Sequence, residues 1–411
     1  MKAGYVLLDG CADRPVPGLN LTTPLESAYT PSLDRISSRS KLGNVTTVGK
    51  GVAPESDIAV FNMLGYSFSS GYPGRGVVEA VGAGLDIRDG DLALRANLAS
   101  ARGTTIVDRR AGRNLTQGEA EALARDLKSV ELTGARFEFK ATIGYRGVLV
   151  IRAETPLSAA ISNTDPAYAR MGGFGAAKAS TGPDRVSKAS PETDSPGAKR
   201  AAELVNEFSV KAQRALEQSP VNRERAASGK LLANLVLLRD AGDHLPRLQS
   251  FEEKYGMKGT ALVEMPAEVG IAKMIGMRMV AIKDRKDMRE KASLFSSELA
   301  EGRVVYVHIK GPDEFGHDGD AKGKKENIES IDRGFFSEIL PLIGDVRMAV
   351  SCDHATPCTM KMHSDDPVPL LITGEGKGDG KRFTEPNSKL GSLGHLEGRD
   401  VLGRVLSKGV R

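Results

Sequence analysis

The feature of this sequence that most constrains its fold is a set of short apolar runs, each ending abruptly in polar residues. There are three of them: Tyr5–Leu8 before Asp9, Val304–Val307 before Lys310–Asp313, and Met348–Val350 before Cys352–His354. Runs of this kind are typical of strands that are buried on both faces of a parallel sheet. In such sheets ligands bind beyond the carboxyl ends of the strands, which is where Asp9, Asp313 and Asp353 stand.

Helical patterns follow the apolar runs. Ile328, Ile331, Phe335 and Ile339 recur at i, i+3, i+7 and i+11, which predicts one apolar helix face. Alternating strands and helices predict an α/β core with a mainly parallel sheet flanked by helices.

The middle of the chain has a different character, with many Arg and Gly residues and shorter strand candidates at 137–139 and 147–151. The first apolar run and the last two therefore bracket an insertion. We expect a core formed by residues 1–68 with 249–411, interrupted by an inserted α+β cap domain over 69–248. The length of 411 residues suits two or three domains.

Composition excludes several classes of protein. The formal charge of +4 arises from 57 basic and 53 acidic residues, too small an excess to indicate a nucleic-acid partner. Only 3 cysteines occur, which excludes a disulfide framework and favours a reducing compartment. We find no signal peptide and no apolar run of membrane-spanning length, so we expect a cytoplasmic protein without a membrane partner. The sequence leaves the oligomeric state undetermined.

Three of the six histidines lie close together in the sequence, and each has an acidic neighbour. They occur in Asp313-x-x-x-His317, Asp353-His354 and His363-Ser364-Asp365-Asp366. Imidazole and carboxylate together suit Zn²⁺, Mn²⁺ or Co²⁺, and the carboxylates also accept Mg²⁺. The alternative is that these residues only cap strands or form turns. Convergence of two such clusters would favour a two-metal site for phosphoryl transfer. His308, inside a strand pattern, and His395 are interpreted as structural.

A candidate nucleophile precedes a helical pattern that ends at Gly65. Ser56 stands at or near the predicted helix N-cap, with Asp57 in the first turn. Serine is a favoured capping residue, so a purely structural role accounts for the pattern equally well. The same helix N-terminus would also attract a phosphate group to Ser56.

Arginines are concentrated in the inserted segment. Asp108–Arg113 contains Arg109, Arg110 and Arg113, and Arg146 lies further along. Guanidinium groups bind carboxylate and phosphate through two parallel hydrogen bonds. An anionic substrate is one explanation of this concentration, and ordinary surface charge is the other.

Taken together, these motifs resemble those of the archaeal-type 2,3-bisphosphoglycerate-independent phosphoglycerate mutases, a family of the alkaline phosphatase superfamily. The resemblance extends nearly from end to end. It rests on the segments 8–15, 23–28, 56–59 with 64–66, 108–113, 165–166, 310–320, 353–358 and 363–369.

The resemblance implies an alkaline-phosphatase-like core and an isomerase that interconverts 3-phosphoglycerate and 2-phosphoglycerate in glycolysis and gluconeogenesis. It implies a phosphoserine intermediate at Ser56 and no use of 2,3-bisphosphoglycerate. Two divalent metal ions are implied, with Mn²⁺ placed first and Zn²⁺, Co²⁺ or Mg²⁺ as alternatives. The implied ligands are Asp9, Ser56, Asp353 and His354 for one ion, and Asp313, His317 and His363 for the other.

The resemblance also implies that the cap binds the substrate, through Arg109, Arg110, Arg113 and Arg146. The sequence departs from the family pattern at Cys11, and at Glu55, where the family commonly has Gly. Two other functions are kept as alternatives: a related metal-dependent phosphatase or homoserine-kinase-like phosphotransferase, and a non-catalytic metal-binding protein with the same fold.

Overall fold

The computed structural model describes residues 2–68, 71–171, 174–177 and 184–407. These residues divide into two compact units. The core unit comprises 1–67, 248–264 and 271–411, and the inserted unit comprises 68–247 and 265–270. Within the described residues, no helix is both long enough and apolar enough to cross a membrane.

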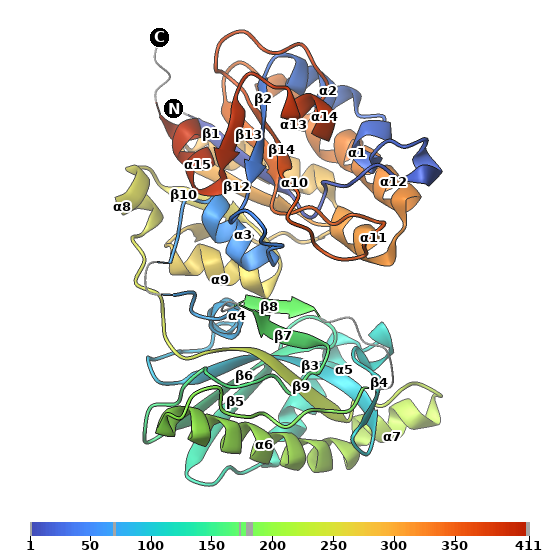
Figure 1. Ribbon diagram of the computed structural model, residues 1–411, viewed down its shortest axis with the longest axis vertical. Helices are drawn as coiled ribbons and strands as arrows, with labels where there is room; N and C mark the ends of the chain where they lie inside the picture. The colour runs from blue at the N-terminus through green and yellow to red at the C-terminus, as the bar shows by residue number, and fades with distance from the viewer. Residues whose placement is uncertain (1, 69–70, 172–173, 178–183, 408–411) are drawn as a thin grey trace. The chain divides into compact units, whose positions relative to one another are not determined.

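The core unit is built on an eight-stranded sheet (Figure 1). In spatial order the strands are β11 (Arg278–Met279), β10 (Gly259–Leu262), β12 (Val304–Ile309), β1 (Ala3–Leu8), β13 (Arg347–Cys352), β14 (Val368–Ile372), β2 (Lys41–Thr46) and β15 (Gly394–Glu397). Five of the pairings are parallel, and only the two pairings made by β14 are antiparallel. The three predicted strands are therefore neighbours at the centre of the sheet, where every residue of β1 and β12 is buried.

Helices flank this sheet (Figure 1), with α10 packed on β1, β10 and β12, and α15 packed on β1, β13 and β15. The helices of the core unit are α1 (Pro24–Ser27), α2 (Pro31–Ser38), α3 (Ser56–Met63), α8 (Phe251–Tyr255), α10 (Met288–Ala300), α11 (Pro312–Asp318), α12 (Ala321–Ile331), α13 (Ser337–Ile339), α14 (Glu385–Lys389) and α15 (Gly398–Leu406). Several begin at capping side chains, as at Asp287 before α10 and Asp320 before α12, which satisfy the first free N–H groups.

The predicted apolar face of Ile328, Ile331, Phe335 and Ile339 is buried, but the helix that carries it is not regular. α12 ends at Ile331, and a π-helical turn covers Asp332–Phe336 before α13. The buried Asp332 carboxylate accepts the backbone N–H groups of Ser32 and Leu33. The π-helical turn therefore contains the residue whose carboxylate caps the first turn of α2.

The inserted unit contains an antiparallel sheet of five strands. These strands are β3 (Leu92–Arg102), β4 (Thr105–Asp108), β5 (Ala135–Ala141), β6 (Arg146–Ala153) and β9 (Leu235–Gly242). Its helices are α4 (Arg75–Ala83), α5 (Gln117–Asp126), α6 (Pro196–Glu217) and α7 (Pro220–Ala227), and β7 (Tyr168–Met171) pairs separately with β8 (Phe174–Ala177). The 22-residue α6 packs on β9, and its Phe208 stacks with Phe139 of β5.

The expected core range of 249–411 includes a segment that belongs to the inserted unit, and this is a correction. Helix α9 (Pro266–Met274) begins in Met265–Gly270, which groups with the inserted unit. A Cβ atom on Gly82 of α4 would lie 1.9 Å from the Pro266 carbonyl oxygen, and one on Gly270 would lie 1.9 Å from the Val78 carbonyl oxygen. Because only glycine permits such close backbone contact, α4 and the start of α9 pack as one piece. The predicted fold class, a mainly parallel α/β core interrupted by an inserted α+β domain, is confirmed.

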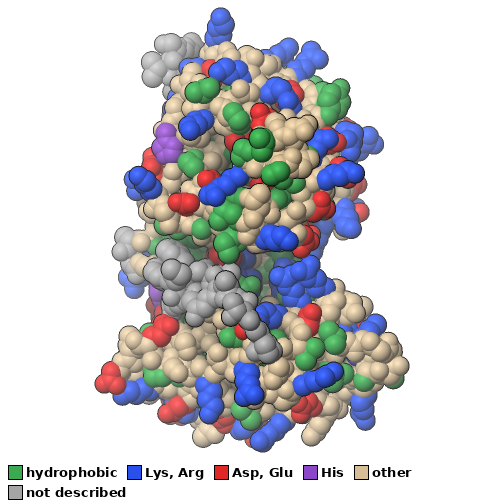
Figure 2. Space-filling model, turned by 45° about the vertical axis from the view of Figure 1, so that its right-hand side comes forward, with side chains coloured by type: hydrophobic (Ala, Val, Ile, Leu, Met, Phe, Trp, Pro, Cys, Tyr) green, Lys and Arg blue, Asp and Glu red, His purple; other side chains and the backbone are tan. Residues whose placement is uncertain are grey.

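Acidic and basic side chains are interspersed on the face shown in Figure 2. This distribution agrees with the nearly balanced composition of 57 basic and 53 acidic residues.

Candidate active site

The polar residues that follow the central strands converge at one edge of the core sheet. Asp9 follows β1, Asp353 and His354 follow β13, and Asp313 lies in α11, which begins shortly after β12. Because these strands are parallel and adjacent, their carboxyl ends bring the three segments together. Two groups of candidate ligands result.

The first group consists of Asp9, Asp353 and His354, all buried. Their potential ligand atoms lie within 4.8 Å of one another. His354 Nε2 is 3.3 Å from Asp353 Oδ2 and 3.6 Å from Asp9 Oδ1. Ser56 Oγ lies 3.1 Å from the same His354 nitrogen. The structure therefore places all four side chains predicted for the first metal next to one another.

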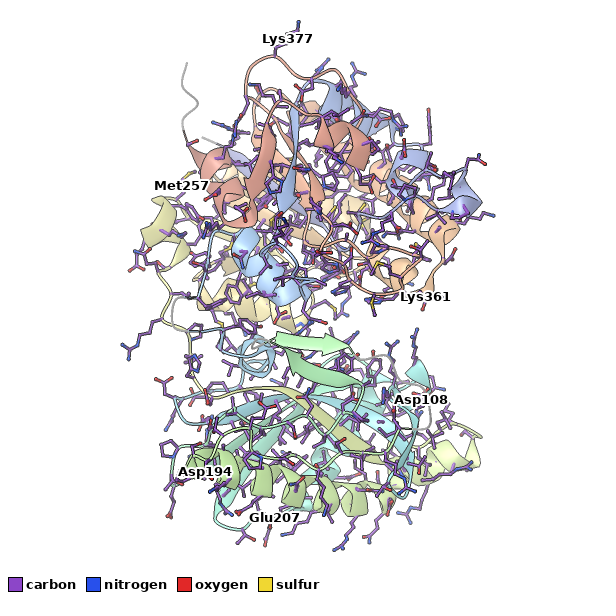
Figure 3. All side chains as sticks on the ribbon, viewed as in Figure 1. Asp108, Asp194, Glu207, Met257, Lys361 and Lys377 are labelled. Carbon is purple, nitrogen blue, oxygen red and sulfur yellow. The ribbon has the colours of Figure 1, made fainter. Side chains whose placement is uncertain are left out.

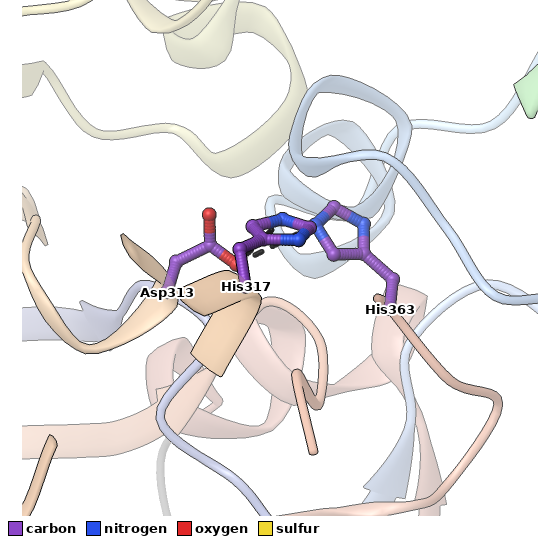
Figure 4. A group of neighbouring side chains, drawn as sticks. All are labelled: Asp313, His317 and His363. Carbon is purple, nitrogen blue, oxygen red and sulfur yellow. Dashed lines mark hydrogen bonds and ion pairs between the residues drawn. The ribbon is translucent and has the colours of Figure 1, made fainter. Parts of the chain in front are cut away.

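The second group consists of Asp313, His317 and His363 (Figure 4). Asp313 Oδ1 is 3.5 Å from His317 Nε2 and 3.4 Å from His363 Nε2, and the two nitrogens are 3.2 Å apart. The ring of His363 also stacks on that of His354, with centroids 3.8 Å apart. The two groups are therefore immediate neighbours, as a two-metal site requires.

The two histidine rings of the second group are oriented in the same way. His363 Nδ1 lies 2.8 Å from the Pro54 carbonyl oxygen, and His317 Nδ1 lies 3.1 Å from that of Lys361, a residue labelled in Figure 3. A carbonyl oxygen only accepts, so each Nδ1 carries the proton and donates it. Each Nε2 then faces the acidic residues, the arrangement usual for histidines that bind metal ions.

Two buried carboxylate oxygens in the first group have no hydrogen-bond partner among the described residues. They are Asp9 Oδ1 and Asp353 Oδ2, both of which face His354 Nε2. An unsatisfied buried charge is costly, and a cation held between these oxygens and the imidazole would satisfy them. The donor set of carboxylate oxygen and imidazole nitrogen thus fits a divalent metal ion.

The carboxyl groups of the first group have opposite pKa shifts. Burial raises the pKa of Asp9 to about 7, against the lowering effect of Lys310, whose Nζ lies 3.1 Å from Asp9 Oδ2. Burial also acts to raise the pKa of Asp353, but the nearby His354 and His308 hold it well below its usual range. The pKa values of two adjacent carboxyl groups move apart in this way when no cation lies between them, because the two groups do not ionise equally easily.

The histidines also differ in pKa. Burial lowers the pKa of His354 to about 4, so its imidazole is neutral at pH 7. Burial acts in the same direction on His363, but its hydrogen bond with Asp313 and the charge of Glu55 raise the pKa of His363 to about 9. A metal ion bound there would displace a proton, because a ligating imidazole must be neutral.

Ser56 does not cap its helix, which differs from one interpretation of the sequence. Glu55 occupies the N-cap position without a side-chain capping bond, and Ser56 is the first residue of α3. Because Ser56 lies inside the first turn, its hydroxyl is directed to His354 rather than to the helix backbone. The sequence alone could not distinguish these positions, because they differ by one residue.

His308 was interpreted as structural, but it lies against the first group. Its Nε2 is 3.4 Å from Asp353 Oδ2 and 3.7 Å from Asp9 Oδ1. Its position near the carboxyl end of β12, beside Leu7 of β1, is the feature that could have indicated a place in the site. Lys310, which contacts Asp9, also lies at the carboxyl end of β12 and could have been found in the same way.

The four predicted cap arginines occupy two neighbouring places in the inserted unit. Arg109, Arg110 and Arg113 follow β4, and Arg146 begins β6. Asn97 of β3 pairs with Arg146, and its side chain donates to the Arg109 carbonyl oxygen. Arg113 is exposed, whereas the other three arginines are half-buried.

The partners of these arginines include a buried acidic residue, Asp165, which belongs to one of the motifs that carry the family resemblance. Asp165 lies 3.4 Å from Arg109 Nη1 and 3.7 Å from Arg239 Nη1. Asp184 also pairs with Arg109. Arg239 stacks on the Tyr168 ring at 3.7 Å. The sheet therefore presents more than one guanidinium group around a shared carboxylate.

The fold and the site define a class of protein: an α/β enzyme with metal-type side chains at the carboxyl ends of a mainly parallel sheet and a large insertion in the chain. Comparison with known proteins identifies the family. A sequence model of the family described as 2,3-bisphosphoglycerate-independent phosphoglycerate mutase matches residues 37–222. Proteins of that name from Aeropyrum pernix and Methanopyrus kandleri are 43% and 39% identical, and cover 97% and 98% of this chain and 97% and 94% of their own.

Solved structures agree with the sequence relatives. A protein from Pyrococcus horikoshii has a TM-score of 0.76 and 29% identity, over 100% of this chain and 99% of its own. The cofactor-independent phosphoglycerate mutase of Thermoplasma acidophilum has a TM-score of 0.63 and 31% identity, over 99% of each chain. The chain belongs to the 2,3-bisphosphoglycerate-independent phosphoglycerate mutase family, which confirms the resemblance read from its motifs.

Proposed function

We propose that this chain is an isomerase that interconverts 3-phosphoglycerate and 2-phosphoglycerate by carrying the phosphoryl group transiently on Ser56. The observation that carries this proposal is the 3.1 Å contact between Ser56 Oγ and His354 Nε2, at the junction of two groups of metal-type side chains. Relatives of 43% and 39% identity that carry the mutase name over nearly the whole chain support the choice of substrate.

The reaction divides into two phosphoryl transfers. In the first, a bond forms between Ser56 Oγ and phosphorus while the bond from phosphorus to the glycerate oxygen breaks. The proton lost by the serine is taken up by the departing glycerate oxygen. In the second transfer, the other glycerate hydroxyl attacks the phosphoserine and returns a proton to Ser56. Phosphoryl group and proton have then exchanged places, and neither water nor 2,3-bisphosphoglycerate has been consumed.

Two divalent metal ions complete this proposal. Asp9, Ser56, Asp353 and His354 would hold one, and Asp313, His317 and His363 would hold the other, with Mn²⁺ as the first candidate and Zn²⁺, Co²⁺ and Mg²⁺ as alternatives. When bound, such ions stabilise the charge that develops on phosphoryl oxygens during transfer. The chain's own residues would position the ions, and His354 holds the Ser56 hydroxyl beside the first group.

The inserted unit would bind the substrate. Phosphoglycerate carries a carboxylate and a phosphate, and guanidinium groups are suited to both. Arg109, Arg110, Arg113 and Arg146 are the candidates, and the three that are half-buried are favoured over the exposed Arg113 because burial strengthens charge-assisted hydrogen bonds. We also propose that the enzyme acts in the cytoplasm, within glycolysis and gluconeogenesis.

The test is an assay of 3-phosphoglycerate conversion to 2-phosphoglycerate, combined with mass spectrometry of acid-quenched enzyme. The wild type should yield a phosphorylated peptide that contains Ser56, and Ser56→Ala should lose both the phosphopeptide and the activity. Ser38→Ala, which alters an exposed serine of α2, should retain both. Free phosphate formed without 2-phosphoglycerate would instead assign a phosphatase, and an ATP requirement would assign a kinase-like enzyme.

A further inference from the structure

We propose that Thr356 is a positioning residue, which orients the His354 imidazole toward Ser56 and connects the first group of candidate ligands to the second. The inference rests on the proposed function, because it concerns how side chains proposed to bind metal ions are held. It assigns a role to a residue that is not among the proposed ligands of either ion.

The threonine hydroxyl makes two polar contacts. Thr356 is fully buried; its Oγ1 donates to Asp313 Oδ1 at 2.7 Å and lies 3.0 Å from His354 Nδ1. A hydroxyl has a single proton, and here it is donated to a carboxylate oxygen, which only accepts when ionised. The contact with His354 must then be a bond in which Nδ1–H donates to the threonine oxygen.

This direction determines the tautomer of His354. A neutral imidazole carries one proton, and here that proton lies on Nδ1. Nε2 therefore presents its lone pair to Ser56 Oγ at 3.1 Å, as well as to the acidic residues of the first group. A continuous chain of hydrogen bonds results, from Ser56 through His354 and Thr356 to Asp313 of the second group.

The fold holds Thr356 rigidly in this position. Its backbone N–H donates to the Ala12 carbonyl oxygen at 3.0 Å, and its own carbonyl accepts from Lys324 Nζ at 2.9 Å. Two glycines make room for it: a Cβ atom on Gly10 would lie 2.5 Å from Thr356 Oγ1, and one on Gly316 would lie 2.8 Å from Thr356 Cγ2. With both backbone groups bonded and both sides filled, the side chain has little freedom to turn.

His354 is also the histidine at which a substitution can test orientation. The Nδ1 partners of His317 and His363 are backbone carbonyl oxygens, which no side-chain change removes. Of these three histidines, as far as the chain is described, only His354 has a side-chain oxygen as its Nδ1 partner.

The experiment compares three variants with the wild type. Thr356→Val keeps the shape and removes the hydroxyl, and Thr356→Ser keeps the hydroxyl. Thr373→Val is the matched control, because Thr373 is also buried in the core unit, donates to Val346 O at 3.0 Å and accepts from Met348 N at 2.8 Å. Thr356→Ala removes the hydroxyl without a second methyl group, and replaces the valine variant if that one does not fold.

Two readouts are independent of catalysis. Nitrogen NMR of EDTA-treated protein labelled in its histidines reports the tautomer of His354, assigned by comparison with His354→Gln. Isothermal titration calorimetry with Mn²⁺ alone reports metal affinity. We expect the wild type, Thr356→Ser and Thr373→Val to keep the proton on Nδ1, and Thr356→Val to lose this preference. Mn²⁺ affinity should fall about 10–100-fold in Thr356→Val and stay near the wild-type value in the other two.

The outcomes separate this inference from the proposed function. A Thr356→Val protein with the wild-type tautomer and Mn²⁺ affinity would overturn the role of Thr356 alone. The same holds if Thr356→Val and Thr373→Val lose stability equally while both bind Mn²⁺ like the wild type. A wild type that binds no Mn²⁺ would count against the proposed two-metal function, and the NMR comparison would still decide the role of Thr356.

Discussion

Asp13 Oδ2 and Lys324 Nζ lie 2.8 Å apart, and neither side chain is exposed to solvent. The lysine ammonium also donates to the carbonyl oxygens of Ala12, at 3.2 Å, and Thr356, at 2.9 Å. Lys324 belongs to α12, and through this lysine the helix connects the loop that follows β1 to the loop that follows β13. These two loops carry Asp9 and the Asp353–His354 pair.

Replacement of this lysine should strongly destabilise the protein. Lys324→Met leaves the Asp13 carboxylate buried without its cation, which we expect to lower the free energy of unfolding by about 3–5 kcal/mol. Urea unfolding followed by circular dichroism measures the change. Lys322→Met is the control on the same helix, since its side chain is 82% exposed, and it should change the free energy by less than about 0.5 kcal/mol. Equal stability of the two variants would contradict the argument.

The neighbouring Glu385 should make stability depend on pH. Burial raises the pKa of Glu385 to about 7, against the hydrogen bonds from Thr23 and from the Asp13 backbone. The unfolded chain loses this proton near its ordinary pKa of about 4.5, so the folded state holds the extra proton between the two values. The wild type should therefore lose up to about 3 kcal/mol of stability as pH rises from 4.5 to 7.

The variant Glu385→Gln isolates this effect, because its amide does not titrate. The free energy of unfolding of the variant minus that of the wild type should increase as pH rises through this interval. Denaturant titrations at pH 5 and pH 8 provide the comparison. A difference that stays constant or decreases with pH would contradict the raised pKa.

The glycine beside Asp9 should not tolerate a side chain. Gly10 has φ of +55°, and a Cβ atom there would lie 2.5 Å from Thr356 Oγ1 and 2.7 Å from Asp313 Oδ1. Gly10→Ala should cost about 2–5 kcal/mol through backbone strain and crowding together, and should reduce mutase activity at least tenfold. Gly18→Ala, for which no atom lies within 4 Å of the added carbon, should leave both quantities unchanged.

Removal of divalent metal should lower thermal stability as well as activity. Bound ions would separate the like-charged carboxylates of the two groups, so EDTA treatment should lower the melting temperature, and Mn²⁺ should restore it. At a free Mn²⁺ concentration of about 100 times Kd the gain is about 2.7 kcal/mol. For a chain of 411 residues this corresponds to a shift of about 3 °C.

A matched pair of variants on α11 tests that the shift comes from the proposed site. Asp313→Asn should abolish most of the Mn²⁺-dependent shift, because it removes a candidate ligand of the second group. Asp318→Asn changes an exposed carboxylate of the same helix and should retain the shift. Calorimetric scans with and without Mn²⁺ distinguish the two, and equal shifts in both variants would place metal binding elsewhere.

The sequence was informative where a single local rule determines the structure. Apolar runs that end in acidic residues identified β1, β12 and β13, because buried parallel strands lack polar alternation. The same rule located Asp9, Asp313 and Asp353, since the carboxyl ends of adjacent parallel strands must meet. The histidine motifs then followed from their acidic neighbours.

Features that depend on packing between distant segments could not be predicted. Lys324 stands in an amphipathic helix, where a lysine is ordinarily exposed, and only the docking of α12 buries it against Asp13. His308 was correctly interpreted as a strand residue, but only the pairing of β12 with β1 places it beside Asp9. The first turn of α9 was assigned to the core unit because sequence order does not reveal the glycine contact with α4.

The position of β1 has a consequence for synthesis on the ribosome. Residues 3–8 are synthesised long before their partners in the sheet, which are residues 304–309 and 347–352. The five-stranded sheet of the inserted unit needs only residues 92–242, so its strands are all available before either partner of β1 has been made. An apolar strand must thus wait for about three hundred residues of translation. During that interval its apolar side chains and its unpaired edges are open to premature aggregation.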